Sequence, residues 1–111
     1  MNNLTKTELD NIYPLGENRT GKPIFITFKA DWWGPCRMFE QVLNEVTPEY
    51  SGKIQMYKVD IEKEPGIAQQ FSARGIPFTV MISKSGERQS QAGSLDKDTL
   101  KYYFEGLINK K

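Results

Sequence analysis

An apolar, strand-like run that turns directly into a helix is the feature that most limits how this chain can fold. Residues 24–28 read Ile-Phe-Ile-Thr-Phe and are apolar apart from Thr27, as expected of a central strand buried on both faces. The turn that follows reads Trp32-Trp33-Gly34-Pro35-Cys36. Beyond it, apolar residues recur at helical spacing and predict a helix packed on a sheet; they are Met38, Phe39, Val42, Leu43, Val46 and Tyr50.

Further strands and helices surround this unit. A first helix should end near Tyr13, and Pro48 should end or kink the second helix. The pattern then predicts a strand at 54–59, a short helix at 65–71, a hairpin of strands at 78–82 and 88–92, and a last helix at 94–109. A strand–helix–strand unit gives a parallel pair, and a hairpin gives an antiparallel one. We therefore expect an α/β fold, with a mixed central sheet flanked by helices on both faces, in a single domain over residues 1–111.

Composition excludes several classes of function. The net charge is +1 with both signs interspersed, which offers no surface to nucleic acid or to an anionic membrane, and no apolar run reaches the length of a membrane helix. The chain has no histidine, so it can build neither a Ser-His or Cys-His nucleophile nor a histidine metal site. We expect no metal and no cofactor.

The amino terminus lacks the apolar core of a signal peptide. A cytoplasmic protein is therefore the simplest expectation, although an exported chain trimmed of its signal would look the same.

Two motifs together resemble the thioredoxin family. That family has Trp-Cys-Gly-Pro-Cys at a strand-to-helix junction and, later, a Gly-Ile-Pro whose proline is cis and faces the active site. The matching positions in this chain are Trp32, Gly34, Pro35 and Cys36, followed by Gly75, Ile76 and Pro77. The resemblance extends over nearly the whole chain. It implies a thioredoxin-like fold and an ancestry among protein disulfide reductases, which act on protein or peptide substrates.

Trp33 is the main departure from the family pattern, because it stands where the attacking cysteine belongs. Dithiol exchange needs one thiolate to attack a disulfide and a second thiol to release the product. An indole can do neither, so we expect dithiol turnover to be absent. Cys36, the only cysteine, matches the resolving thiol; it is either an inert buried residue, which we favour, or a monothiol that captures a partner. At Trp33 we favour natural divergence over an engineered change.

Thr27 is a second departure. The family usually places a buried aspartate there to move protons to and from the resolving thiol, with a lysine beside it that Lys58 matches. Thr27 can form hydrogen bonds but does not titrate, so Lys58 has no acidic partner at that position. Thr27 alone decides little, since redox-active relatives without this aspartate exist.

The resemblance also implies a binding face. The Ile76–Pro77 bond should be cis, and Ile76 should offer its backbone to an extended peptide by strand addition. We expect these residues to line that face: Trp32, Trp33, Gly34, Pro35, Ile76, Pro77, Phe78 and Gly93. Trp33 leaves two arrangements open, an apolar groove that is accessible and one that its own ring closes. We favour the accessible groove, because Trp32 needs much of the same space.

Three functions follow from these residues. The first is a redox-impaired module that binds an extended peptide or protein partner at the tryptophan and cis-proline face. The alternative is a thiol-disulfide oxidoreductase, either a monothiol variant that uses Cys36 or an active-site-substituted form of a dithiol parent; such a protein would also meet a thioredoxin reductase. The third is a structural or accessory subunit, in which neither the tryptophans nor Cys36 would matter and another surface would make the contact.

Overall fold

The structure, a computed structural model, describes residues 1–110 and places five strands of this part in one sheet. The strands are β1 (Asn2–Asn3), β2 (Ile24–Lys29), β3 (Gln55–Asp60), β4 (Phe78–Ile82) and β5 (Arg88–Ala92). The helices are α1 (Lys6–Ile12), α2 (Gly34–Val46), α3 (Pro65–Gln70) and α4 (Lys97–Asn109), with 3₁₀ turns η1 (Pro14–Gly16) and η2 (Thr47–Tyr50).

The strand order across the sheet is β1-β3-β2-β4-β5, so the predicted strand at 24–28 is central. β3 pairs in parallel with both β1 and β2, whereas β4 pairs antiparallel with β2 and β5. The predicted mixed sheet is confirmed. β1 was not predicted, because two polar residues carry no strand pattern and are ordered only by pairing with β3.

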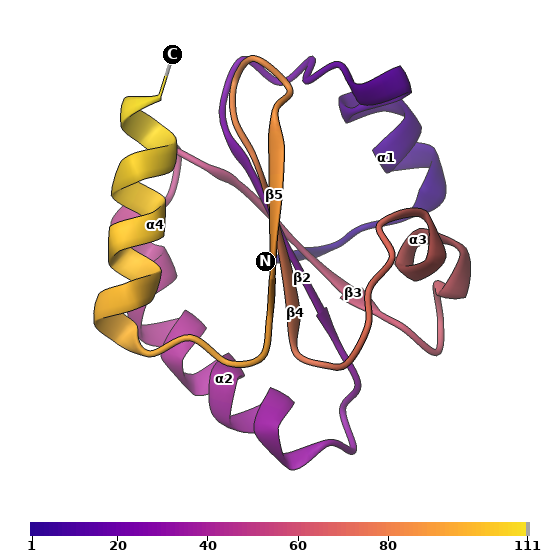
Figure 1. Ribbon diagram of the computed structural model, residues 1–111, viewed down its shortest axis with the longest axis vertical. Helices are drawn as coiled ribbons and strands as arrows, with labels where there is room; N and C mark the ends of the chain where they lie inside the picture. Colours follow the sequence, from indigo (N-terminus) through magenta and orange to yellow (C-terminus); the bar gives the residue numbers. More distant parts are fainter. Residues whose placement is uncertain (111) are drawn as a thin grey trace.

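Helices cover both faces of the sheet, as expected. In Figure 1, α2 and α4 lie on one side of the strands and α1 and α3 on the other. Each side has its own core. Leu9 of α1 and Ile67 of α3 pack with Ile26 and Phe28, while Phe39 of α2 and Phe104 of α4 pack around Phe25. No helix within residues 1–110 is long and apolar enough to span a membrane.

The ends of the predicted helices are nearly right, but one residue is misplaced. α2 ends at Val46, and Pro48 falls in the 3₁₀ turn that follows. α4 begins at Lys97, later than the predicted Ser94, because the Asp96 carboxylate caps it by accepting a hydrogen bond from Thr99 N at 2.8 Å. Met38 was predicted on the buried side of α2 and is 70% exposed. The sheet covers only the stripe that contains Cys36, Phe39, Leu43 and Val46.

Candidate functional site

The two motifs lie close together at one end of the central strands. β2 ends at Lys29 and leads through a short turn into α2, while the Ile76–Pro77 bond, which is cis, directly precedes β4. Because β4 runs antiparallel to β2, the end of β2 and the start of β4 lie side by side. Gly93 follows β5 at the same end, and its N–H donates to Pro77 O at 2.8 Å. The fold thus brings the predicted site residues together.

Trp33 occupies the N-cap position of α2, the residue whose carbonyl begins the helix. It has extended backbone angles, and its carbonyl accepts hydrogen bonds from Cys36 N at 3.1 Å and Arg37 N at 3.2 Å. Its side chain makes no capping bond. The amide dipoles at such a terminus stabilise a thiolate, but an indole has no negative charge to stabilise.

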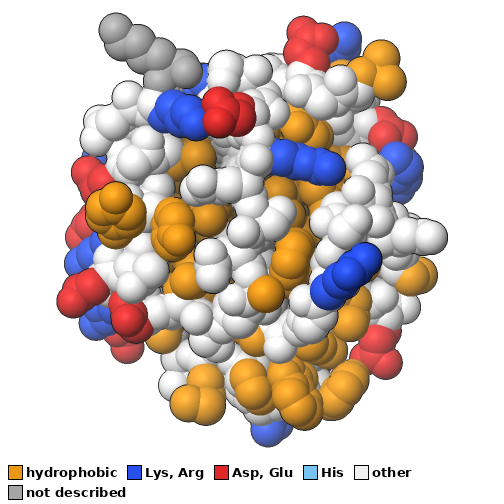
Figure 2. All heavy atoms as spheres, viewed as in Figure 1, with side chains coloured by type: hydrophobic (Ala, Val, Ile, Leu, Met, Phe, Trp, Pro, Cys, Tyr) orange, Lys and Arg blue, Asp and Glu red, His pale blue; other side chains and the backbone are white. Residues whose placement is uncertain are grey.

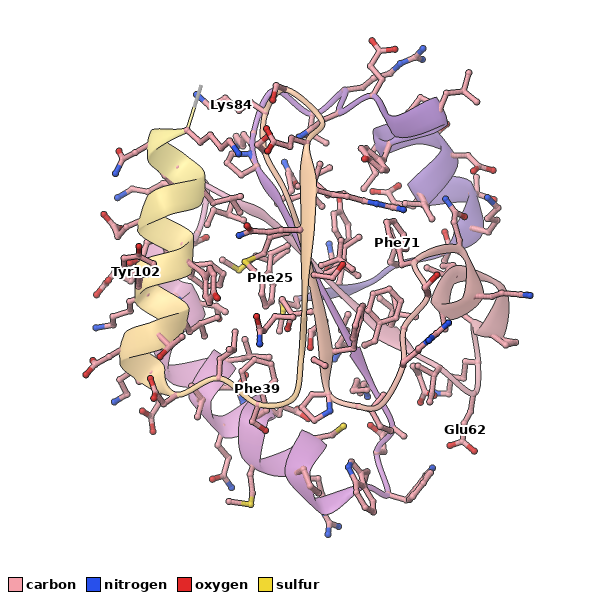
Figure 3. The ribbon with its side chains drawn as sticks, in the orientation of Figure 1. Phe25, Phe39, Glu62, Phe71, Lys84 and Tyr102 are labelled. Atoms are coloured by element: carbon pink, nitrogen blue, oxygen red, sulfur yellow. The ribbon has the colours of Figure 1, made fainter. Side chains whose placement is uncertain are left out.

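The two indoles at the site have different hydrogen-bond partners. Trp33 Nε1 donates to the backbone carbonyl of Ile76 at 3.0 Å, and Trp32 Nε1 donates to Glu62 Oε1 at 2.7 Å. The rings meet edge to face with centroids 5.8 Å apart. Glu62, labelled in Figure 3, comes from the connection between β3 and α3, so Trp32 is tied to a different part of the chain than Trp33.

The exposed surface of the site is apolar. Trp32 is 62% exposed and Trp33 is 42% exposed. Met38, which was predicted to be buried, is a third large exposed apolar side chain near the start of α2. Figure 2 shows hydrophobic side chains gathered along the lower edge of the molecule, where α2 begins. We call Trp32, Trp33 and Met38 the tryptophan patch.

Two predictions about the binding face are corrected by the structure. Phe78 is buried, because its ring packs on Phe28 with centroids 6.0 Å apart; it supports the site from the core and is not on the surface. Pro77 is buried as well, and Ile76 is half-buried. Since the Ile76 carbonyl is already bonded to Trp33, the groove that we expected to be accessible is closed there.

Cys36 lies beneath the patch and is only 5% exposed. Burial raises the pKa of its thiol, against smaller opposing effects of a backbone hydrogen bond with Ala30 and of the Lys29 charge. Lys29 itself donates to Asp31 and holds the pKa of Asp31 below its usual range. Cys36 is therefore a neutral thiol near neutral pH, and a neutral thiol is a poor nucleophile.

A small cavity of about 50 Å³ lies on the inner side of Cys36, between α2 and the sheet. Thr27, 3% exposed, and Lys58 line it. Lys58 forms no ion pair within residues 1–110. In the same part of the chain, Cys36 and the carboxylates form no group of three or more that could hold a metal ion.

The cavity lies at one point of a polar row that sequence reasoning missed. The pairing registers place five polar residues side by side across all the strands, on the face covered by α2 and α4; in order they are Asn3, Lys58, Thr27, Thr79 and Gln91. Thr79 is fully buried, and its hydroxyl has no hydrogen-bond partner. Only Thr27 and Lys58 carried a signal in the sequence; the others join the row through strand register, which the sequence does not state.

Known proteins give an independent comparison. The thioredoxin family model matches residues 7–105. An M-type chloroplastic thioredoxin of Spinacia oleracea is 46% identical over 78% of this chain and 48% of its own length. Thioredoxin 1 of a Nostoc species is 39% identical over 75% of this chain and 78% of its own length. The chain thus spans about half the length of the chloroplastic relatives it matches.

A crystal structure of chloroplastic thioredoxin z superposes with a TM-score of 0.84 over 99% of this chain and 96% of that one, at 19% identity. At that identity the likeness concerns the fold alone.

Proposed function

The chain belongs to the thioredoxin family, and from this premise we propose that it is a redox-impaired member that binds an extended peptide or protein segment at the tryptophan patch and the Ile76 backbone. The observation that carries the proposal is Trp33 at the position of the motif's first cysteine, with its indole hydrogen-bonded to Ile76 O.

The loss of turnover follows from the thiols. A dithiol reductase forms a mixed disulfide at its first cysteine and resolves it with the second. This chain has one cysteine, so it cannot close an intramolecular disulfide. That cysteine is buried, and its pKa is raised. Both steps of the exchange therefore lack a competent group.

The binding role follows from the exposed face. Tryptophan is among the residues that dominate the binding energy of protein interfaces, and adjacent exposed tryptophans favour a contact surface over a merely solvated one. Ile76 lies just before β4 and is only half-buried, which suits a segment that adds to its backbone in extended conformation. Such a partner needs no disulfide.

An insulin-reduction assay with dithiothreitol tests the redox half of the proposal. We expect no precipitation of insulin above the dithiothreitol background for this chain. Trp33→Cys should restore turnover, because it returns the attacking thiol to the helix terminus, and Trp33→Ser is the matched control that opens the same space without a thiol. Turnover by the unaltered chain would overturn the proposal. Silence of Trp33→Cys would place a further defect at Thr27 and Lys58.

A thiol-disulfide oxidoreductase remains the second candidate. The relatives at 39% and 46% identity carry the name thioredoxin, and apart from position 33 this chain keeps the residues of both motifs. Under this candidate Cys36 forms mixed disulfides as a monothiol, or Trp33 replaces the cysteine of a dithiol parent that a thioredoxin reductase recycles. Labelling of Cys36 by a thiol reagent in the folded protein would favour it.

The location is also part of the proposal. The sequence pattern alone favours the cytoplasm, whereas several relatives are named as chloroplastic. A fluorescent fusion of the complete gene product, followed in cells that contain plastids, distinguishes the two.

A further inference from the structure

The bond between Trp33 and Ile76 places a side chain of the protein on the group that a partner strand would use. An added strand binds through backbone N–H and C=O groups of the receiving edge. Ile76 O already accepts the Trp33 indole N–H, while Ile76 N–H donates to no backbone carbonyl within residues 1–110. The carbonyl half of the backbone pair is therefore occupied within the protein.

Steric exclusion makes this occupation a competition. A carbonyl oxygen has two lone pairs, so one hydrogen bond does not exhaust it. However, the indole nitrogen lies 3.0 Å from Ile76 O, and a backbone N–H must approach the same oxygen to about the same distance. The bicyclic ring that carries this nitrogen and an incoming strand would therefore compete for the space around Ile76 O.

Displacement of the indole is cheap. Trp33 is 42% exposed, so water replaces the lost hydrogen bond when the ring swings away. A hydrogen bond of this kind has a net worth that corresponds to about 2- to 12-fold in an equilibrium constant. The free site is therefore mostly closed but readily opened, and its apparent affinity is reduced by the fraction that is closed.

We infer that Trp33 determines which segments this site accepts: its indole N–H holds the Ile76 carbonyl in the free protein, and a partner must displace it with a backbone N–H of its own. The inference rests on the proposed binding function and adds a rule of selection. An accepted segment is extended, has a free N–H opposite Ile76, and presents an apolar side chain to the tryptophan patch. A segment with proline at that position is rejected.

The first test needs no ligand. In the ¹⁵N-labelled protein, the Trp33 indole N–H should exchange with solvent about 2- to 12-fold more slowly than that of N-acetyl-tryptophanamide. Trp33→Phe assigns the signal by removing it. Exchange at the rate of the model compound would overturn the inference, because the carbonyl would then be free.

The second test uses insulin B chain with carboxymethylated cysteines as the probe, which supplies an extended apolar segment without reactive thiols. Trp33→Phe keeps a ring and loses the N–H, so it should bind the probe about 2- to 12-fold more tightly than the unaltered protein. Trp33→Ala should bind more weakly than Trp33→Phe, since it also removes the aromatic surface. Trp32→Phe is the matched control: it removes the indole N–H that is bonded to Glu62, and it should not tighten binding.

The outcomes separate the two claims. If both proteins bind the probe but Trp33→Phe binds it no more tightly, the selection rule is overturned and the binding function stands. If neither the unaltered protein nor Trp33→Phe binds, the binding function is overturned for extended segments, and the selection rule is lost with it.

Discussion

The same two central strands present very different surfaces to the two layers of helices. Toward α1 and α3, β2 and β4 present only apolar side chains: Ile24, Ile26 and Phe28 from one strand, Phe78, Val80 and Ile82 from the other. Toward α2 and α4, an apolar pair, Phe25 and Met81, is followed at once by a polar pair, Thr27 and Thr79. The polar pair belongs to the polar row, and Thr27 lines the cavity next to Cys36.

Within one sheet, the face toward α1 and α3 is therefore packed for stability alone, whereas the face toward α2 and α4 carries polar side chains near the candidate site. Burial of a hydroxyl without a partner costs free energy, so a face built for stability alone would carry none. The α1/α3 face follows that rule. The α2/α4 face breaks it at Thr79, whose strand partner Thr27 lines the cavity next to Cys36. Departures from local rules of this kind are expected near functional sites.

The largest expected effect comes from moving a polar group to the apolar face. Ile26→Thr puts a hydroxyl among fully buried apolar neighbours and removes a methylene, which should lower the free energy of unfolding by about 2–4 kcal/mol. Urea denaturation measures it. Ile26→Val is the control for lost volume, at about 0.5–1.5 kcal/mol. Equal losses for the two variants would show that this face tolerates polarity as the other does.

Alkaline titration should weaken the fold in part through Tyr50, which lies in the α2/α4 core. Burial, and after it the Glu105 and Glu49 carboxylates, raise the pKa of Tyr50 from 10.0 to about 12. The folded state thus retains a proton that the unfolded chain releases near pH 10. Stability is full below that pH and falls as the pH rises toward 12. Tyr50→Phe should flatten this part of the stability profile measured by denaturation at each pH; an unchanged slope in Tyr50→Phe would assign the loss to other groups.

The smallest expected effect comes from repairing the polar row. Thr79→Val removes a buried hydroxyl without a partner and keeps the shape, so it should raise the free energy of unfolding by about 1 kcal/mol. Thr27→Val is the comparison, and its gain should be smaller because Thr27 borders the cavity. Thermal unfolding of both variants gives the order. Destabilisation by Thr79→Val would mean that this hydroxyl has a bonding partner in solution.

The fold could be predicted from the sequence because its strong signals are local. The apolar run at 24–28, the helical spacing after Pro35 and the hairpin at 78–92 each determine an element without help from distant residues. β1 could not be predicted, because it exists only through pairing with β3. Met38 was assigned to the wrong side since two neighbouring stripes of α2 are apolar, and the sheet covers one of them.

The candidate site was predictable as a set of residues but not as an arrangement. Motif spacing named Trp33, Cys36, Ile76 and Pro77. Whether the groove is open depends on one rotamer of Trp33 and on its bond to a carbonyl 43 positions later in the chain. Tertiary contacts determine the side-chain rotamer at a surface turn, and a sequence pattern does not predict those contacts.

The chain contains two tryptophans, and both lie at the site. Intrinsic tryptophan fluorescence therefore reports on the site without an added label. Ultraviolet emission from the folded protein at indole-selective excitation arises there and nowhere else. One ring emits beside a carboxylate and the other beside a carbonyl, so loss of the second contact changes a signal that has no background from the rest of the molecule. A spectrum of the unlabelled protein then reads the occupancy of the site directly.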